Sequence, residues 1–375
     1  MTERIMVDLL GFTGTRGGTE TYASEILTRL PAALPGVDFI GLTGSAGAAQ
    51  VAGFFPGQLR VIPWVHDDKH SWAAAEIARA NAVARRSHAD ALWTPANFGP
   101  IRRGLPRAVT IHDVIYDEIP GGATDRAVRA VTAWLMRRSA RTADAVITVS
   151  HAAADSIAHH LGIRRAGIHV VPNGSSTPPS SPPPVDELDG LAIDRARPLL
   201  LSTGNRMPHK NFGGLLEALA ALPPGSRPFA VITGGRDHDP LTGVVAELGL
   251  QRDVLLARWL EAPVLEALYA RAAVYACPST AEGFGLPVVD ALRRGCLVVA
   301  NDIPVLREVG GEAVRYADAT DPAAFAAAIA GALADPDPRT RIAEGRGWAE
   351  QFSWDSAAAG VAAVLRCLLA ARGRA

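Results

Sequence analysis

The chain alternates short apolar runs with longer amphipathic stretches. The apolar runs are four to six residues long, and we predict strands at Ile5–Leu10, Val37–Leu42, Ala108–Ile111, Ala145–Val149, Pro198–Ser202, Phe229–Thr233, Asp253–Ala257, Val274–Pro278 and Leu297–Ala300. The amphipathic stretches predict helices at Glu20–Leu30, Asp125–Arg141, Phe212–Leu222, Pro263–Arg271, Pro287–Arg294 and Trp354–Arg372. Buried strands that alternate with helices are typical of parallel α/β sheets covered on both faces. Such doubly wound sheets bind ligands where strands run into loops at their carboxyl ends.

A proline-rich break divides this pattern in two. Ser175–Pro184 contains five prolines, four serines and a threonine, so it forms neither a helix nor a central strand. We interpret residues 175–189 as a semi-rigid linker. The sequence therefore predicts two Rossmann-like domains, residues 1–174 and 190–350, that face a central cleft.

Composition narrows the class of protein. Of the 375 residues, 48% are hydrophobic and 20% are charged, which is ordinary for a globular protein, and the net charge of −1 gives no electrostatic reason to bind nucleic acid. The three cysteines lack zinc or CxxC spacing, which excludes a disulfide framework and favours a reducing, cytoplasmic compartment. No apolar run reaches the roughly 18 residues of a membrane span, and the N-terminus is interpreted as a strand, not a signal peptide.

The loop Pro278–Asp290 is the most informative segment of the chain. It follows a predicted strand, and Gly283 and Gly285 leave its backbone without side chains. Pro287 suits the first turn of the next helix. The amides of Phe284–Leu286 can therefore point at a ligand, with the positive end of the helix dipole behind them.

Two carboxylates flank this loop. Glu282 precedes the helix, and Asp290 lies about one turn into it. Carboxylates beside an anion-binding turn favour a ligand with hydroxyl groups around a phosphate, as in a nucleotide sugar. The alternative for Glu282 is an ordinary charge at the start of a helix.

A second loop, Ser202–Asn211, carries two cations. Arg206 and Lys210 lie four residues apart, and Asn211 opens the next helix, so together they can clamp a diphosphate. Lysine is rare here, because only Lys69 and Lys210 occur among the 37 basic residues, and this strengthens the case for Lys210. The alternative is a solvated loop.

Three further loops give weaker signals. The glycine-rich loop Gly11–Glu20 follows the first strand but lacks a clean G-x-G-x-x-G. His112 stands at the end of a strand, where it can bond a polar ligand or be a satisfied structural histidine, and Asp113 can orient it or cap a turn. Asp237 and Asp239 can hold a divalent metal, although a polar turn is the favoured interpretation, and we predict no metal site.

These motifs resemble retaining glycosyltransferases of family 4, which have the two-domain GT-B architecture. The resemblance covers essentially the whole chain and is strongest over Pro278–Gly311, which carries the EGFGLP-type stretch. Ser202–Asn211 resembles the phosphate-binding loop of the family. Ala145–Ile163 and His169–Gly174 resemble the end of its N-terminal domain, and Phe352–Trp354 resembles the start of a helix, within residues 351–375, that crosses back onto that domain.

The resemblance implies roles for individual residues. Glu282 would contact the hydroxyls of the donor sugar, Arg206 and Lys210 would neutralise the leaving diphosphate, and His112 would face the donor sugar and the acceptor. These four are the implied catalytic residues. Donor binding is assigned to Gly17, Gly18, Gly204, Asn205, Arg206, Lys210, Glu282, Gly283, Phe284, Gly285, Leu286 and Asp290, of which the first two also line the acceptor side.

The implied reaction is transfer of a hexosyl group, with mannose favoured, from a GDP- or UDP-sugar to a glycan or lipid-linked hydroxyl, as in polysaccharide biosynthesis. Configuration at the anomeric carbon would be retained, without a metal and without a cofactor. The alternatives are another GT-B enzyme (a sugar-nucleotide epimerase or a phosphorylase), a dinucleotide dehydrogenase and a non-catalytic sugar-nucleotide-binding module. The helix Asp125–Arg141 carries five arginines and Trp134, so it suits either peripheral contact with an anionic membrane or an ordinary solvated face.

The chain departs from the family pattern at four places. Asp290 is one methylene shorter than the usual glutamate, and His209 stands where many members have arginine. Ser175–Ser176 replaces the common Val-Asp after Asn-Gly, and Arg258–Trp259 occupies a loop where glycine is usual. These differences affect the expected contacts to the ribose, the diphosphate and the base.

Overall fold

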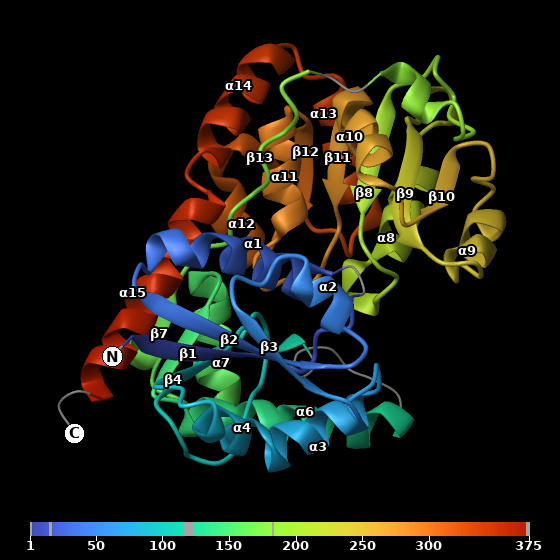
Figure 1. Ribbon diagram of the computed structural model, residues 1–375. Coiled ribbons are helices and arrows are strands. Elements are labelled where there is room, and N and C mark those ends of the chain that lie inside the picture. Colours follow the sequence, from blue (N-terminus) through green and yellow to red (C-terminus); the bar gives the residue numbers. More distant parts are fainter. Residues whose placement is uncertain (1, 15–16, 116–122, 182–183, 373–375) are drawn as a thin grey trace. The chain divides into compact units, whose positions relative to one another are not determined.

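The computed structural model describes residues 2–14, 17–115, 123–181 and 184–372 (Figure 1), and the side chains of residues 69–70, 123–128, 185 and 372 lie outside the description. The predicted loop Gly11–Glu20 and the predicted linker Ser175–Pro184 each include two residues that are not described, and the side chains of residues 125–128 of the predicted basic helix are not described either. The chain folds into two compact units, one formed by residues 1–174 and 353–375 and the other by residues 175–352.

The first unit is built on a parallel sheet of seven strands in the order β3-β2-β1-β4-β5-β6-β7. The strands are β1 Glu3–Leu9, β2 Val37–Gly44, β3 Gln58–Ile62, β4 Ala91–Thr94, β5 Arg107–Thr110, β6 Ala145–Thr148 and β7 Ile168–Val170. Its helices are α1 Gly18–Ala33, α2 Ala48–Ala52, α3 Lys69–Ala78, α4 Ala80–Arg86, α6 Ala123–Thr142, α7 His151–Leu161 and α15 Trp354–Arg372.

The second unit has a parallel sheet of six strands in the order β10-β9-β8-β11-β12-β13. The strands are β8 Leu199–Thr203, β9 Phe229–Gly235, β10 Val254–Arg258, β11 Ala272–Cys277, β12 Leu297–Asn301 and β13 Val314–Ala317. Its helices are α8 Phe212–Ala221, α9 Leu241–Glu247, α10 Ala262–Arg271, α11 Leu286–Arg294, α12 Pro304–Gly310, α13 Pro322–Leu333 and α14 Pro338–Ala349.

Both sheets reverse their strand order at one point. In the first unit the reversal lies between β1 and β4, and in the second it lies between β8 and β11. Loops that leave neighbouring strands on the two sides of a reversal diverge, and the crevice they leave is where open α/β sheets bind ligands. The predicted α/β class with two Rossmann-like sheets is therefore confirmed.

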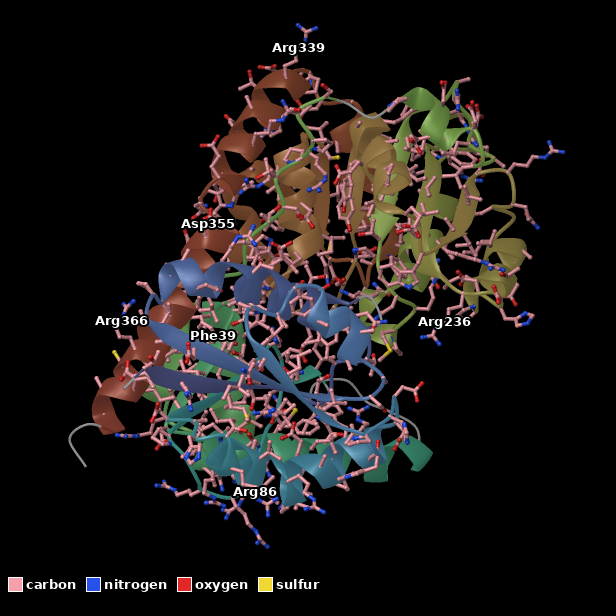
Figure 2. The ribbon with its side chains drawn as sticks, in the orientation of Figure 1. Phe39, Arg86, Arg236, Arg339, Asp355 and Arg366 are labelled. Atoms are coloured by element: carbon pink, nitrogen blue, oxygen red, sulfur yellow. The ribbon has the colours of Figure 1, made fainter. Side chains whose placement is uncertain are left out.

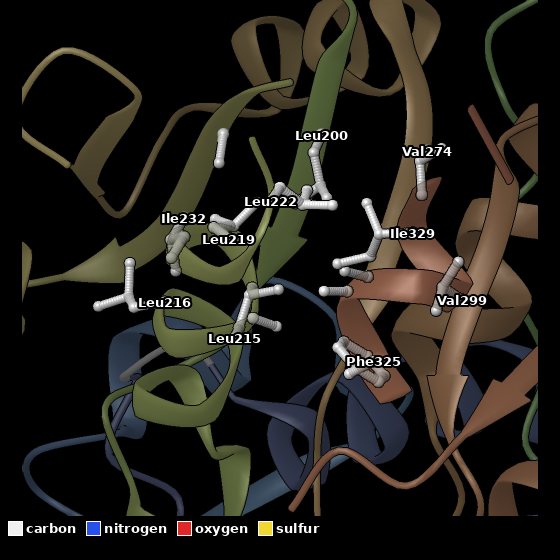
Figure 3. Packing of buried hydrophobic residues seen from close by; sticks show 14 of the residues in the cluster. Leu200, Leu215, Leu216, Leu219, Leu222, Ile232, Val274, Val299, Phe325 and Ile329 are labelled. Carbon is white, nitrogen blue, oxygen red and sulfur yellow. The ribbon is translucent and has the colours of Figure 1, made fainter. Parts of the chain in front are cut away.

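The core of the second unit explains why its helices form where they do. In α8 the apolar positions recur three and four residues apart, so one face of the helix is apolar. Leu215 and Leu219 from this face lie fully buried with Phe325 and Ile329 from α13 against the sheet residue Leu200 (Figure 3). Burying such a side chain contributes about 1.5–3 kcal/mol, so this packing anchors both helices to the sheet.

The final helix α15 completes the first unit and spans the predicted Trp354–Arg372. It packs on α1, and the carboxylate of Asp355 accepts a hydrogen bond of 3.0 Å from Arg29, while Arg366 donates one of 3.0 Å to the carbonyl of Ala33 (Figure 2). By length and composition, the helical stretch 338–371 is long and apolar enough to cross a membrane, but half of its apolar window is buried inside the fold. A core helix passes the same test, so this finding is weak evidence for a membrane span.

Candidate functional site

The reversal point of the second sheet brings together two of the loops predicted from the sequence. The backbone N–H of Thr280, after β11, donates to the carbonyl of His209, after β8, at 2.8 Å. The Nζ of Lys210 lies 2.6 Å from Oε1 of Glu282, and the two side chains are only 15% and 10% exposed. The structure therefore places the predicted lysine and the predicted glutamate in one buried ion pair.

Local backbone geometry explains the conformation of the loop between β8 and α8, which carries Lys210 and is called the lysine loop below. Gly204 has φ +150°, and a Cβ on Gly234 of β9 would lie 2.3 Å from the carbonyl oxygen of Gly204, so only glycine permits this approach. Asn211 adopts the left-handed conformation with φ +49°, which ends the loop, and its Nδ2 donates to the carbonyl of Ala319 at 2.8 Å. The predicted donor residue Asn205 is exposed, and its Oδ1 accepts from the next turn of the loop.

The loop between β11 and α11, which carries Glu282, ends at the N-terminus of α11. Gly285 is the residue before this helix and has φ +97°, and a Cβ there would lie 2.8 Å from Cδ2 of Leu306. Phe284 is buried, with its ring centroid 5.5 Å from that of Phe352. The first N–H groups of a helix have no partner within the helix, so α11, which begins at Leu286, presents donors and the positive end of its dipole beside the loop. An anion fits these donors.

Burial shapes the ionisation of the neighbouring groups. Burial and the charge of the Glu282 carboxylate together raise the pKa of the Cys277 thiol to about 11, so this cysteine stays a neutral thiol. Burial and the charge of Lys210 lower the pKa of His209 below its usual range. At neutral pH the ring of His209 therefore adds no charge beside the ion pair.

Arg206 lies in the same loop as Lys210, but its guanidinium is bound by other groups of the protein. Its guanidinium pairs with Asp239 at 2.7 Å, with both side chains 9% exposed, and a further hydrogen bond of 2.8 Å runs from Nε to the same carboxylate. The remaining N–H groups donate to the carbonyls of Gly204, Thr233 and Ile232 at 2.9–3.2 Å. An arginine has five N–H donors, and all five are engaged in this arrangement. Arg206, which follows β8, thus connects the lysine loop to β9 through its hydrogen bonds to Thr233 and Ile232.

The carboxylate of Asp290 also has partners within the protein. Its Oδ1 accepts a hydrogen bond of 2.5 Å from the hydroxyl of Ser175 and lies 3.4 Å from Arg294. Burial raises the pKa of Asp290, and Arg294 and Ser175 oppose that rise. In the sequence, Ser175 stands out only as a departure from the family pattern, and the pairing of its hydroxyl with Asp290 was missed because the two residues lie 115 positions apart.

The predicted residues of the first unit are His112, Gly17 and Gly18. His112 is 7% exposed, its Nε2 lies 3.0 Å from the carbonyl of Pro95, and its ring meets Tyr22 edge-on at 4.7 Å. A carbonyl only accepts, so the Nε2 carries hydrogen and Nδ1 is the acceptor of a neutral ring. Burial lowers the pKa of His112 to about 4, which keeps the ring neutral. Gly17 and Gly18 lie exposed at the start of α1, and a Cβ at either position would meet no atom within 4 Å.

The aspartates considered for a metal have arginine partners instead. Asp239 pairs with Arg206, as described above, and Asp237 pairs with Arg258, one of the residues that depart from the family pattern. Within the described part of the chain, no group of three or more His, Cys, Asp or Glu side chains is arranged to hold a metal ion. Asp113 accepts from the backbone N–H of Ile115 at 3.3 Å, as a turn-capping aspartate does.

Comparison with known proteins places the chain in a family. Residues 16–177 match the family model "Glycosyltransferase Family 4", and residues 187–346 match the model "Glycosyl transferases group 1". The MMP alpha-(1->4)-mannosyltransferase of Mycolicibacterium hassiacum is 29% identical over 284 residues, which cover 70% of this chain and 66% of that protein. The O-antigen chain mannosyltransferase B of Escherichia coli is 36% identical over 163 residues, 42% of each chain. The matched stretches span less than two thirds of either relative.

Solved structures share the fold over nearly the whole chain. A sucrose-phosphate synthase from Thermosynechococcus elongatus superposes with a TM-score of 0.78 at 21% identity, covering 98% of this chain and all of that one. Anabaena Alr3699/HepE, solved in complex with UDP, superposes with a TM-score of 0.73 at 19% identity, covering 97% of this chain and all of that one. The two family models together match most of the chain, one in each half, and the chain belongs to the family 4 glycosyltransferases, in which its second half is a group 1 glycosyl transferase domain of the GT-B fold.

Proposed function

We propose that this protein is a retaining hexosyltransferase that moves a sugar, with mannose favoured, from a nucleoside diphosphate sugar to a hydroxyl acceptor. The observation that carries the proposal is the buried pair of Lys210 and Glu282 beside the N-terminus of α11. A cation and free helical N–H groups suit a diphosphate, and a carboxylate suits sugar hydroxyls. In this proposal the second domain binds the donor, and the first domain binds the acceptor.

The chemical task is to stabilise a departing diphosphate next to a sugar that carries positive charge. The bond from the anomeric carbon to the diphosphate oxygen breaks, and the acceptor oxygen bonds to that carbon on the same face. The proton of the acceptor hydroxyl passes to the departing diphosphate oxygen. Lys210 and the N–H groups at Gly285 and Leu286 take up the negative charge, so we propose that the countercharge comes from the protein and not from a metal.

We propose separate roles for the other predicted residues. Glu282 accepts hydroxyl hydrogens of the donor sugar while Lys210 turns to the diphosphate, and Asp290 takes the ribose with its second oxygen. Arg206 acts indirectly, because its brace with Asp239 holds the lysine loop in place. His112, as a neutral acceptor, faces the donor sugar.

The base of the donor can be identified by testing a panel of nucleoside diphosphates for binding. The two relatives are named for mannose transfer, and HepE was solved with UDP, so GDP-mannose and UDP-sugars are the first candidates. Melting temperature is measured with UDP, GDP, ADP and dTDP. A ligand at 100 times its Kd stabilises the fold by about 2.7 kcal/mol, so the matching base gives a clear shift, and no shift with any of the four would contradict the proposal.

The catalytic assignment is tested with three variants. Lys210→Met and Glu282→Gln remove one charge each at similar size, and we expect each to lower turnover of the sugar nucleotide by about 100-fold or more. Asp194→Asn is the matched control, because Asp194 pairs with Arg197 at 2.9 Å, just before the amino end of β8 and so at the opposite edge of the sheet. Near-normal transfer by either site variant would refute the assignment. Proton NMR of the product reports whether the anomeric configuration is retained.

Membrane contact is a further part of the proposal. Along α6, the residues Trp134, Arg137, Arg138 and Arg141 recur three and four positions apart, and all four are exposed, with Trp134 at 52%. An exposed aromatic ring with three cations on one helix face suits the surface of an anionic membrane, where a lipid-linked acceptor would lie.

Vesicle binding tests this contact. Sedimentation with phosphatidylglycerol-containing vesicles is expected to capture the protein, and Arg137→Gln with Arg138→Gln is expected to reduce the bound fraction several-fold. The control replaces Arg85 and Arg86, two exposed arginines of α4 in the same unit, by Gln. Equal loss in both double variants would mean that total charge, and not this helix face, governs binding.

A further inference from the structure

The first unit contains a second buried pair of titratable groups, at the reversal point of its own sheet. Asp8 on β1 is 1% exposed and Glu76 on α3 is 2% exposed. Each has one satisfied oxygen, since Asp8 Oδ1 accepts from the N–H of Leu10 at 3.2 Å and Glu76 Oε1 accepts from the indole of Trp72 at 3.1 Å. The other two oxygens, Oδ2 and Oε2, are fully buried and receive no N–H donor from the described residues.

The two carboxyl groups form a hydrogen bond with each other. Burial raises the pKa of both, and the charge of Asp8 raises that of Glu76 further, well above its usual range. Glu76 therefore binds a proton more readily than Asp8 does. The charge of the buried Arg107 opposes the rise of both pKa values, while its two terminal nitrogens donate to the carbonyls of Pro100 and Ser139 and to Thr142, and its Nε has no hydrogen-bond partner among the described residues. The two carboxyls thus have few donors from the described part of the chain.

A cavity of about 30 Å³ opens beside this pair. Asp8 and Glu76 line it together with Trp72 and with Pro95, which follows β4, so it lies where a doubly wound sheet binds its ligand. By this measure a water molecule needs about 10–15 Å³, so the space fits one or two hydroxyl-sized groups. Glu20 also lines the cavity and already accepts from the N–H of Thr13.

An aromatic wall completes the cavity. Trp72 stacks on Phe98 with centroids 4.5 Å apart, and it crosses so close to Gly11 that a Cβ on that residue would lie 2.5 Å from the indole ring. A flat apolar ring beside a hydrogen-bond acceptor suits a ring-shaped polyol, which has apolar C–H faces and hydroxyl edges. The lining that the structure describes contains carboxyls and no lysine or arginine.

We propose that this cavity is an acceptor subsite that takes the hydroxyl edge of an uncharged sugar or polyol, with the Asp8 carboxylate accepting a hydroxyl hydrogen and Glu76 holding Asp8 in place. The inference rests on the proposed transferase function and specifies its acceptor. A phosphate or carboxylate on this part of the acceptor would lie against carboxyl groups without a cation in the described lining, which is unfavourable. Asp8 is thus a specificity-determining residue for neutral acceptors.

The acceptor preference is measured first on the unaltered protein, with the sugar nucleotide chosen by the nucleotide panel. Methyl α-mannoside and myo-inositol are compared with mannose 6-phosphate, myo-inositol 1-phosphate and glucosamine. We expect the neutral members to be used with a KM at least about tenfold lower than their phosphorylated counterparts. Glucosamine, whose amine suits a carboxyl-lined cavity, is expected to be used at least as well as the neutral members are. A preference for the phosphorylated members, or failure of both neutral members, overturns the proposal.

Two variants separate the partners of the pair. Asp8→Asn replaces a carboxyl oxygen that accepts hydrogen bonds by an amide, so we expect it to raise the KM for the neutral acceptor by about tenfold or more, with the nucleotide-induced melting shift unchanged. Glu76→Gln keeps a neutral group, so we expect it to change the KM by less than about threefold. An unchanged KM in Asp8→Asn overturns the proposal, and if that variant does not fold, the acceptor panel decides alone.

The failure of this inference is distinguishable from failure of the proposed function. If no nucleoside diphosphate shifts the melting temperature and no sugar nucleotide is consumed, the transferase proposal itself fails. If the nucleotide binds and the sugar is transferred only to charged acceptors, the transferase stands and the assignment of the cavity fails.

Discussion

The buried imidazole of His112 makes a quantitative prediction about stability and pH. Burial lowers its pKa to about 4, whereas a histidine in the unfolded chain titrates near 6.5. The unfolded state therefore binds a proton more readily than the folded state, and this group's contribution to stability is fully present above about pH 6.5. As the pH falls from 6.5 towards 4, that contribution is lost.

The size of the loss follows from the two pKa values. Between pH 7 and pH 5, proton binding to the unfolded state lowers the free energy of unfolding by about 2 kcal/mol, and the loss reaches about 3 kcal/mol near pH 4. The desolvation that causes this shift comes from a side chain only 7% exposed, which packs on Tyr22 and bonds to Pro95.

Urea unfolding of the unaltered protein and of His112→Gln measures this contribution. Glutamine does not titrate in this range, so the difference between the two proteins in free energy of unfolding should fall by about 2 kcal/mol from pH 7 to pH 5. The control is His159→Gln, which removes an exposed histidine of α7 in the same unit. If the unaltered protein and His112→Gln show the same pH dependence, the imidazole is not held neutral and the reasoning fails.

Three further substitutions test the site through stability. Arg206→Ala leaves Asp239 buried without its cation, so urea unfolding should show a loss of about 3 kcal/mol or more, while an unchanged midpoint would favour a direct ligand role for the arginine. Gly285→Ala forces a side chain into φ +97° and should lose about 1–2 kcal/mol together with the nucleotide-induced melting shift, whereas Gly213→Ala, inside α8 with open space around it, should be neutral or stabilising. Gly174→Ala would bring a Cβ within 2.1 Å of the backbone of α15, and thermal melting should show the first unit to be destabilised.

Hydrophobic patterning predicted the elements that build both cores. Each apolar run interpreted as a strand coincides with one, and the last helix has the predicted bounds. Strand β3, Gln58–Ile62, was missed because it lies at the sheet edge and three of its five side chains are exposed, so its sequence resembles that of a loop. Strands β4, β7 and β13 were missed as well, and short length alone does not explain this, because β5 and β6 also have four residues and were predicted.

The sequence predicted which loops form the candidate site, but it did not predict which side chains pair with one another there. The glycine pattern and the rare lysine identified the segments around Glu282 and Lys210, which the structure joins at 2.6 Å. Nothing in the local sequence indicates that Arg206 is saturated, because Asp239 lies 33 residues away and its approach depends on the register of β8 against β9. Asp8 did carry a signal, an acid within an apolar strand, but its partner becomes evident only in the folded chain.

The position of α15 has a consequence for how the chain acquires its structure during synthesis. The first unit needs residues from 353 onward, since Val361 and Leu365 are fully buried in it, although residues 1–174 leave the ribosome much earlier. At about 5–20 residues per second, some 10–40 seconds pass before this helix is made. Over that interval the apolar face of α1 that packs on α15 stays exposed. The second unit is continuous in sequence, so it can fold as soon as it emerges. The later half of the chain can therefore reach its native state before the earlier half, and a chaperone that shields apolar helices would act on the nascent first unit.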